Sequence, residues 1–211
     1  MVSIGGEGVG AVWYDVSMRI ILILGGARSG KSTFAERLAA RSERSVAFIA
    51  TATATDDDMR ARIARHRADR PATWHTVEEA LHLAAAVQRA AAVADVLLLD
   101  CITTWLANWL FAQDDPALAE AETISAAHEA SVLAEVEMLL KTCSTLDAGK
   151  TVVVVSNEVG LGIVPAYPLG RAYRDILGRV NQRLAVSAAR VYLMVAGLAV
   201  DIKRLHEDAS L

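Results

Sequence analysis

Eight residues near the N-terminus, 25–32, constrain the fold more than any other part of the chain. They read GGARSGKS and fit the pattern G-x-x-x-x-G-K-[ST] at every defined position. In this pattern the glycines let backbone N–H groups reach phosphate oxygens where a Cβ would clash. The charge of Lys31 suits the β- and γ-phosphates of a nucleotide, and the Ser32 hydroxyl suits Mg²⁺. We therefore expect a phosphate-binding loop here.

The segments on either side of the loop support this interpretation. An apolar run, 19–24, precedes it, and residues 31–40 follow with helical spacing, since Phe34 and Leu38 share a face. The start of a helix after Lys31 adds the positive end of the helix dipole to the phosphate site. A glycine-rich turn that only joins a strand to a helix would not require the lysine and the hydroxyl at these positions.

Strand-like and helix-like segments alternate along the rest of the chain. Further apolar runs of strand length occupy residues 46–50, 96–100, 151–155 and 191–196. Longer segments with helical spacing include residues 132–140 and 173–184. This alternation predicts a three-layer α/β fold with a mostly parallel sheet. Gly197 permits a tight turn into 199–203, which we expect to run antiparallel at the sheet edge.

Composition and charge limit the classes of protein to which the chain can belong. With 211 residues and a net charge of −4, we expect one acidic globular domain and no nucleic-acid partner. The two cysteines form no C-x-x-C pair, so the sequence favours a reducing, cytoplasmic location. No apolar run reaches the ~18 residues of a membrane span. Residues 1–17 lack a signal-peptide pattern and periodicity, so we expect a dispensable extension before a single domain, 18–211.

A carboxylate at the end of an apolar run gives a second indication of a nucleotide site. Asp100 closes the run 96–100, as expected for an aspartate that orients Mg²⁺ beside a phosphate loop. Its alternative role is to cap the helix that follows. Asn157 and Glu158 directly follow the run 151–155, so they are placed either at the ligand-binding rim of the sheet or in turn and capping roles.

An arginine-rich segment with one histidine follows the second apolar run. Residues 57–70 read DDMRARIARHRADR and end before Pro71, which predicts a helix. Met59, Ile63 and His66 fall on one face of it. Nearby arginines would keep the imidazole neutral and would bind phosphate oxygens. His66 is therefore either a nucleophile or a packed core residue. Trp105 and Trp109, four residues apart, are more typical of a packing stripe than of a base-stacking surface.

Several blocks together resemble the bifunctional adenosylcobinamide kinase/adenosylcobinamide-phosphate guanylyltransferase family of vitamin B12 assembly. The resemblance extends over residues 19–203. Besides GGARSGKS, it rests on IATATATDDDM at 49–59, RIARHRADRPATW at 62–74 and LLLDCITTWLAN at 97–108. The most specific blocks are SNEVGLGIVP at 156–165 and GRAYRDILGRVNQRLA at 170–185.

The resemblance implies a role for particular residues. The guanylylated histidine of the family matches His66, and Lys31 joins it as a catalytic residue. Ser32 and Asp100 are implied as Mg²⁺ ligands. The implied nucleotide contacts are Gly25, Gly26, Ala27, Arg28, Ser29, Gly30, Lys31, Ser32, Ala50, Thr51, Ala52, Arg67, Ala68, Asp69, Arg70, Glu78 and Asp100. The implied fold is similar to the core of recombinase-type P-loop proteins, and relatives form trimers.

The chemistry implied by the resemblance has two steps. A phosphoryl group passes from ATP or GTP to adenosylcobinamide. His66 then takes GMP from GTP, and adenosylcobinamide phosphate accepts the GMP to give adenosylcobinamide-GDP. The covalent intermediate on His66 divides the guanylyl transfer into two displacement reactions. Two alternatives are a monofunctional small-molecule kinase and a non-catalytic, regulatory nucleotide-binding module. A signalling GTPase is disfavoured because the guanine motif N-K-x-D is absent from the sequence.

Overall fold

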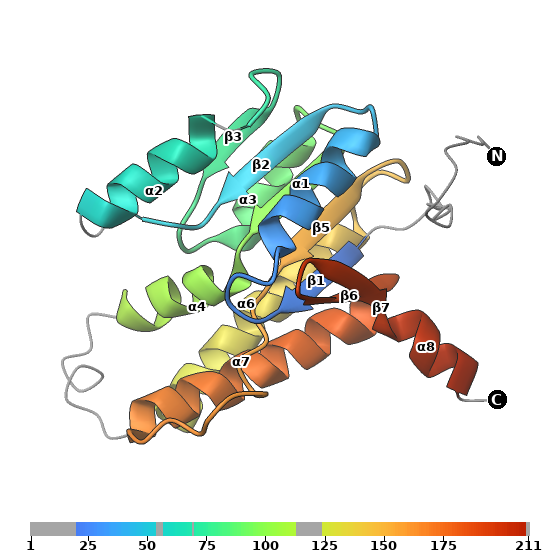
Figure 1. Ribbon diagram of the computed structural model, residues 1–211. Coiled ribbons are helices and arrows are strands. Elements are labelled where there is room, and N and C mark those ends of the chain that lie inside the picture. The colour runs from blue at the N-terminus through green and yellow to red at the C-terminus, as the bar shows by residue number, and fades with distance from the viewer. Residues whose placement is uncertain (1–19, 54–56, 69, 113–123, 210–211) are drawn as a thin grey trace.

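A parallel sheet with one antiparallel edge forms the centre of the protein. The computed structural model describes residues 20–53, 57–68, 70–112 and 124–209. Within these ranges the sheet has seven strands (Figure 1). In spatial order they are β3 (His75–Glu78), β2 (Val46–Ala50), β4 (Val96–Asp100), β5 (Thr151–Val155), β1 (Ile20–Gly25), β6 (Arg190–Val195) and β7 (Leu198–Asp201). Neighbouring strands pair in parallel, except that β7 runs antiparallel to β6.

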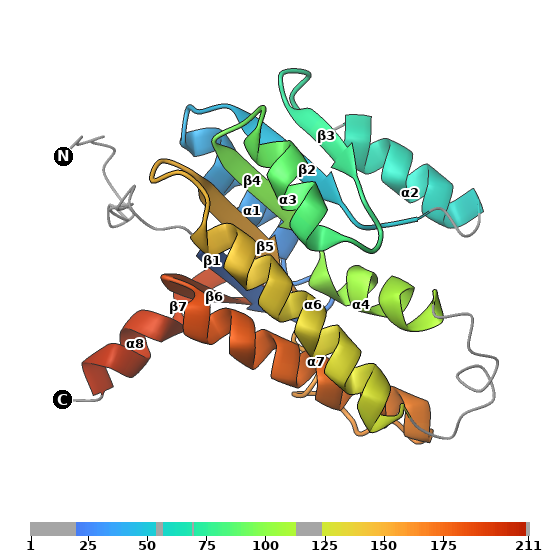
Figure 2. The ribbon, with the colours of Figure 1, turned by 180° about the vertical axis from the view of Figure 1, so that it is seen from behind.

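Helices cover both faces of the sheet and give the molecule three layers. Helix α1 lies on one face, and α3, α6 and α7 lie on the other, as the two opposite views show (Figures 1 and 2). The described helices are α1 (Lys31–Arg41), α2 (Asp57–Ala68), α3 (Leu83–Ala91), α4 (Ile102–Phe111), α6 (Ala126–Ser144), α7 (Pro168–Ser187) and α8 (Ile202–Ala209). None of these combines the length and the apolar character that a membrane crossing requires. The predicted three-layer architecture with an antiparallel edge is confirmed.

The central strands are buried on both faces, which explains their uninterrupted apolar sequence. Leu97 and Leu99 of β4 pack with α3, α4, α6 and α7, whereas Leu98, between them, packs on the side of α1. All three side chains are fully buried. Because side chains alternate between the two faces, each helical layer receives every second residue of a strand. The core therefore holds the carboxyl ends of these strands in fixed positions.

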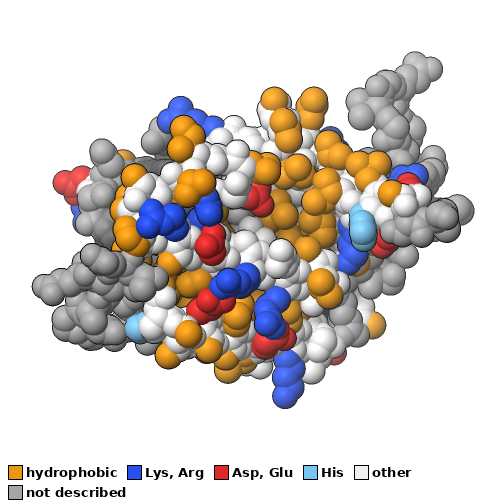
Figure 3. Space-filling view, turned by 90° about the horizontal axis from the view of Figure 1, so that it is seen from below, with side chains coloured by type: hydrophobic (Ala, Val, Ile, Leu, Met, Phe, Trp, Pro, Cys, Tyr) orange, Lys and Arg blue, Asp and Glu red, His pale blue; other side chains and the backbone are white. Residues whose placement is uncertain are grey.

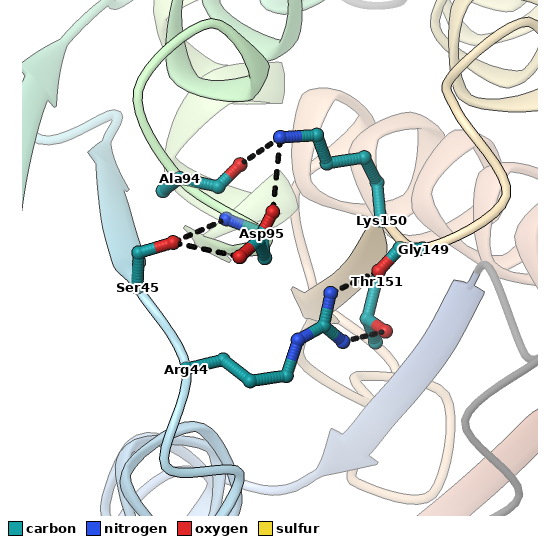
Figure 4. Close-up of polar contacts among 7 residues, drawn as sticks. All are labelled: Arg44, Ser45, Ala94, Asp95, Gly149, Lys150 and Thr151. Atoms are coloured by element: carbon teal, nitrogen blue, oxygen red, sulfur yellow. Dashed lines mark hydrogen bonds and ion pairs between the residues drawn. The ribbon is translucent and has the colours of Figure 1, made fainter.

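A polar cluster ties together the amino-terminal ends of β2, β4 and β5 (Figure 4). The Ser45 hydroxyl donates to an Asp95 carboxylate oxygen at 3.0 Å, and Lys150 Nζ lies 3.1 Å from the other oxygen. Arg44 reaches across to the Thr151 hydroxyl at 3.4 Å. These contacts join three neighbouring strands at the edge of the sheet opposite to their carboxyl ends.

Most predicted boundaries agree with the structure, and the last strand is the clearest exception. The predicted strands 46–50, 96–100 and 151–155 match β2, β4 and β5 at both ends, and β6 is displaced by one residue. The predicted edge strand 199–203 was wrong at its end, because α8 begins at Ile202. Asp201 causes this change, since its carboxylate accepts a hydrogen bond from the Arg204 backbone N–H at 3.1 Å and caps the helix. The predicted extension 1–17 lies outside the described residues.

Candidate nucleotide site

The carboxyl ends of four parallel strands meet at one edge of the sheet, where the phosphate loop lies. Ala50 of β2 pairs with Asp100 of β4, and Asp100 pairs with Val155 of β5. The segment after β5 reaches the loop through a hydrogen bond from the Glu158 backbone N–H to the Gly25 carbonyl, at 3.0 Å. Because ligands of α/β sheets bind outside the carboxyl ends of the strands, this edge is the expected position of the site.

Two glycines of the loop allow approaches that a side chain would prevent. A Cβ at Gly25 would lie 2.6 Å from the Met194 carbonyl oxygen and 2.7 Å from the Ser29 hydroxyl. Gly30, which caps α1, has a φ of 93°, in the left-handed region that favours glycine. The loop is also fixed from outside, because the Gly197 N–H donates to the Ser29 carbonyl at 3.0 Å. The geometry of the loop therefore requires glycine at both positions where the motif defines one, Gly25 and Gly30.

The loop lysine is buried and held against the backbone. Lys31 is 8% exposed, and its Nζ donates to the Gly26 carbonyl at 2.7 Å. Burial lowers the pKa of Lys31, while the negative charges of Cys101, when ionised, and of Asp100 raise it. The Ser29 hydroxyl is buried and has no hydrogen-bond partner in the described part of the chain. The loop thus presents an ammonium group and a buried hydroxyl at the start of α1.

Hydrogen bonds of Thr51 and Asn108 fix the backbone next to Asp100, and the N-cap position of the following helix belongs to the next residue. The N-cap of α4 is Cys101, and it makes no side-chain capping bond. The buried Thr51 hydroxyl donates to the Cys101 carbonyl and accepts from the Cys101 N–H, both at 2.9 Å. Asn108 in turn donates to the Thr51 carbonyl at 2.7 Å. This arrangement favours the rim interpretation of Asp100 over the capping interpretation.

Two of the predicted arginines lie at the same rim, on the side of β2 and β3. The Arg70 guanidinium carbon lies 3.3 Å from the centroid of the Phe48 ring. Burial lowers the pKa of Arg70, and the charges of Glu36 and Asp100 oppose that effect. Arg67 Nη1 lies 3.6 Å from a Glu78 carboxylate oxygen, and both side chains are largely exposed. Arg70 is therefore near Asp100, whereas Arg67 and Glu78 line the outer border.

Helix α2 carries the candidate nucleophile and projects beyond the edge strand β3 (Figure 1). The predicted helix 57–70 is confirmed as Asp57–Ala68, and His66 lies within it. Asp69 lies outside the described residues. The same holds for the side chains of Met59, Ile63 and His66, which form the predicted helix face. Of the remaining predicted contacts, Ala52 is partly exposed and Ala68 is exposed.

Residues after β5 form a hydrogen-bonded network that sequence reasoning did not detect. The buried Ser156 hydroxyl donates to the Asn181 side chain at 2.7 Å, and Asn181 donates to the Asn157 carbonyl at 3.0 Å. The Asn157 N–H donates to the Thr103 hydroxyl at 2.9 Å. Glu158 accepts from the Gly160 N–H, which is the turn role considered for it. The rim is thereby joined to α4 and α7.

Comparison with known proteins decides the family. Residues 21–202 match the family model described as cobinamide kinase / cobinamide phosphate guanyltransferase. The chain belongs to this family. The matched range includes the phosphate loop, α2 and the network after β5, so the site described above lies within the part shared with the cobinamide kinase / cobinamide phosphate guanyltransferase family.

Curated relatives agree with this assignment, and one solved structure shares the fold. The bifunctional adenosylcobalamin biosynthesis protein of Salmonella typhimurium (strain LT2) is 46% identical over 87% of the chain and 99% of its own length. The bifunctional adenosylcobalamin biosynthesis protein of Pseudomonas aeruginosa is 46% identical over 86% of the chain and 96% of its own length. An ATPase of a bacterial type III secretion system aligns with 90% of the chain and 54% of its own, with a TM-score of 0.53 and 12% identity. At that identity the likeness shows a common fold alone.

The tryptophan pair of α4, which the family block 97–108 includes, contributes to the core. Trp105 is fully buried, and its ring centroid lies 6.2 Å from that of Trp109. The Trp105 indole N–H donates to the Leu81 carbonyl at 2.8 Å. The packing interpretation of this pair is confirmed.

Proposed function

We propose that this chain is a bifunctional transferase that catalyses both reactions in the name of its family, the kinase reaction and the guanylyl transfer. It phosphorylates adenosylcobinamide with ATP or GTP, and then transfers GMP from GTP to adenosylcobinamide phosphate. The observation that carries the proposal is the position of Lys31, which is buried and folded over the phosphate loop in a chain of this family. The negative charge of Asp100 is close enough to raise the pKa of Lys31. No step of the proposal requires a nucleic acid or a membrane.

In the first step the terminal hydroxyl of adenosylcobinamide attacks the γ-phosphorus of the triphosphate. A new O–P bond forms, the bond between the γ-phosphorus and the bridging oxygen breaks, and the hydroxyl proton passes to solvent. Lys31 and the backbone N–H groups of residues 25–32 stabilise the negative charge that develops on the phosphate oxygens. The Ser29 hydroxyl, which has no partner among the described residues, adds one donor to the same oxygens.

The residues of the rim are suited to Mg²⁺, which prefers oxygen ligands. The Ser32 hydroxyl, in the first turn of α1, and the Asp100 carboxylate, at the end of β4, would hold the ion. When bound, Mg²⁺ supplies positive charge that balances the phosphate oxygens. The negative charge of Asp100 also raises the pKa of Lys31 and partly offsets the lowering caused by burial. Asp100 therefore favours the charged form of the lysine.

In the second step His66 attacks the α-phosphorus of GTP. An N–P bond forms and pyrophosphate leaves. A phosphate oxygen of adenosylcobinamide phosphate then attacks the same phosphorus, the N–P bond breaks, and adenosylcobinamide-GDP is released. Arg67 and Arg70, with the other family contacts Ala50, Thr51, Ala52, Ala68, Asp69, Glu78 and Asp100, would hold the nucleotide between α2 and the phosphate loop. Arg70 supports this role because its guanidinium is half-buried at the rim beside Phe48.

We further propose that the enzyme is a cytoplasmic homo-oligomer, and a trimer by resemblance to the family. Large apolar side chains are exposed on the β6–β7 hairpin and on α8, including Leu198, Val200 and Leu205. Figure 3 shows that apolar side chains gather on one face of the molecule. Monomeric proteins rarely expose a continuous apolar patch of this kind. A second copy of the chain would remove this surface from water.

Two assays with the purified chain test the proposed function. With γ-labelled ATP and adenosylcobinamide, label should pass to the corrinoid. With unlabelled ATP followed by α-labelled GTP, the corrinoid product should carry the α-phosphate. A monofunctional kinase would give only the first product. A chain that binds GTP but labels the corrinoid in neither assay would contradict the proposal.

A further inference from the structure

A cavity of about 400 Å³ lies between the end of α4, the segment 157–167 and the start of α7. Its lining is mostly apolar and includes Leu110, Val159, Pro165, Tyr167 and Tyr173. Arg174 is also in this lining, and its Nε and Nη2 donate to an Asp175 carboxylate oxygen at 3.2 Å, so its other N–H groups are the donors that a ligand could use. A cavity of this size and character is typical of a small-molecule site, in which a few polar groups orient an apolar ligand.

The segment beside the cavity exposes large apolar side chains although it is fixed at both ends. Leu161 is 83% exposed and Ile163 is 97% exposed. At its beginning, the Glu158 N–H donates to the carbonyl of Gly25 in the phosphate loop, as described above. At its end, the Arg171 guanidinium donates to two consecutive backbone carbonyls, those of residues 165 and 166. Apolar groups that are fixed in water in this way mark a binding surface.

Close packing at the start of α7 sets the position of the Tyr167 ring. A Cβ at Gly170 would lie 2.5 Å from Tyr167 Cε2 and 2.9 Å from Pro165 Cβ. The absence of a side chain at Gly170 therefore allows the ring to lie against the helix backbone. Tyr167 as a whole remains 65% exposed beside the cavity, so its ring offers an apolar face to a ligand.

Hydrogen bonds connect the cavity directly with the nucleotide site. The hydroxyl of Tyr173, in the cavity wall, donates to the Thr103 carbonyl at 2.6 Å. Thr103 also accepts from the Asn157 N–H at the rim. It lies in the first turn of α4, three residues after Asp100. A ligand in the cavity would thus lie beside residues that are hydrogen-bonded to the rim that carries Asp100.

We propose that this cavity and the segment 157–167 bind the apolar edge of the corrinoid acceptor. The proposal rests on the proposed function and adds the site of its second substrate. A corrin ring carries methyl groups and amide side chains around its edge. The methyl groups match the apolar lining and the exposed Leu161 and Ile163, and the amide oxygens match the Arg174 guanidinium as a donor. The cavity is smaller than a whole corrinoid, so it takes one edge of the ring while the hydroxyl arm extends toward the phosphate loop.

Equilibrium dialysis of the full chain against adenosylcobinamide, detected by its visible absorbance, tests this site. Tyr167→Ser and Ile163→Ser alter exposed side chains, so both variants should fold. Together they are expected to weaken corrinoid binding by at least about tenfold, the effect of losing the burial of one large apolar group. The affinity for radiolabelled GTP should remain unchanged. Val186→Ser, which alters an apolar side chain that is 81% exposed on α7, is the matched control and should bind the corrinoid normally.

The possible results separate this inference from the proposed function. Unchanged corrinoid affinity in the double variant would overturn the site. A change in sedimentation coefficient with unchanged corrinoid affinity would overturn it as well, since the surface would then bind a second copy of the chain. If the unaltered protein binds GTP but no adenosylcobinamide, the proposed function itself fails. Weakened corrinoid binding with normal GTP binding and an unchanged oligomeric state is the expected result.

Discussion

The Lys31 ammonium donates a hydrogen bond to the Gly26 carbonyl, five residues earlier in the same loop, at 2.7 Å. The side chain is thereby folded back over the loop that encloses it. Since the charge is buried and preorganised at the phosphate site, its removal cannot be compensated by solvent. Lys31→Ala should cost at least about 3 kcal/mol of transition-state stabilisation in both reactions. Lys141→Ala, on the exposed surface of α6, is the control. Near-normal guanylyl transfer by the Lys31 variant would show that this step uses another site.

The link between β5 and α7 should matter for stability. Asn181 is 5% exposed and bonds with both Ser156 and Asn157. Asn181→Leu keeps the volume of the side chain but leaves a buried hydroxyl and a carbonyl without their partner. We expect a loss of about 2 kcal/mol in the free energy of unfolding, measured by urea denaturation. Gln182→Leu, on the exposed side of the same helix, should have little effect. Equal stability of the two variants would contradict the role of the network.

The polar cluster in Figure 4 should make stability depend on pH in the acid range. Hydrogen bonds from Lys150 and then from Ser45 lower the pKa of Asp95 below its ordinary value of 3.8. The unfolded chain therefore binds more protons than the folded chain in this range. The contribution of Asp95 is fully present above pH 3.8 and is lost as the pH falls through the lowered pKa.

Asp95→Asn tests this dependence. At neutral pH the variant should have a Tm lower by a few degrees at most, because the cluster is accessible to solvent. The difference from the unaltered protein should shrink as the pH is lowered through the acid range. Asp175→Asn, which breaks the ion pair with Arg174 on α7, serves as a control for the loss of one charge and one ion pair elsewhere in the chain. A Tm difference that stays constant down to the lowest pH at which the protein is folded would contradict the assigned cause.

The first 17 residues should be dispensable. They show neither apolar periodicity nor a capping pattern, and the family match begins after them, at residue 21. A chain that begins at Met18 is therefore expected to keep its Tm and both activities. A decrease in Tm of more than a few degrees would show that the segment packs against the domain.

The central strands could be predicted from the sequence because their burial does not depend on any one partner. Leu97, Leu98 and Leu99 place apolar side chains on both faces of β4, and such a run indicates a strand that is covered on both sides. The edge strand β3 (His75–Glu78) has no such signal, since three of its four residues are exposed. It is a strand because it pairs with β2, where Ala47 lies opposite His75. That pairing is a tertiary contact and leaves no apolar pattern.

The candidate site shows the same division between local and distant contacts. The phosphate loop and Asp100 could be predicted because each is a short motif next to a strand. The capping role of Asp201 depends on a local contact with Arg204. It could not be predicted, because the sequence around Asp201 fits the continuation of the strand as well as the start of a helix. The bond from Tyr173 to Thr103 joins residues 70 positions apart, so neither residue could be selected from the sequence. The cavity on that side of the rim is a product of packing between α4 and α7.

Labelling of the protein with α-labelled GTP, in the absence of any corrinoid, tests the central claim most directly. The account predicts that label from the α-position is retained, that label from the γ-position is not, and that the adduct is acid-labile and base-stable, as a histidine phosphoramidate is. His66→Ala should abolish labelling and guanylyl transfer but leave the phosphorylation of adenosylcobinamide largely intact, and His75→Ala should label normally. Retained labelling in the His66 variant would contradict the account.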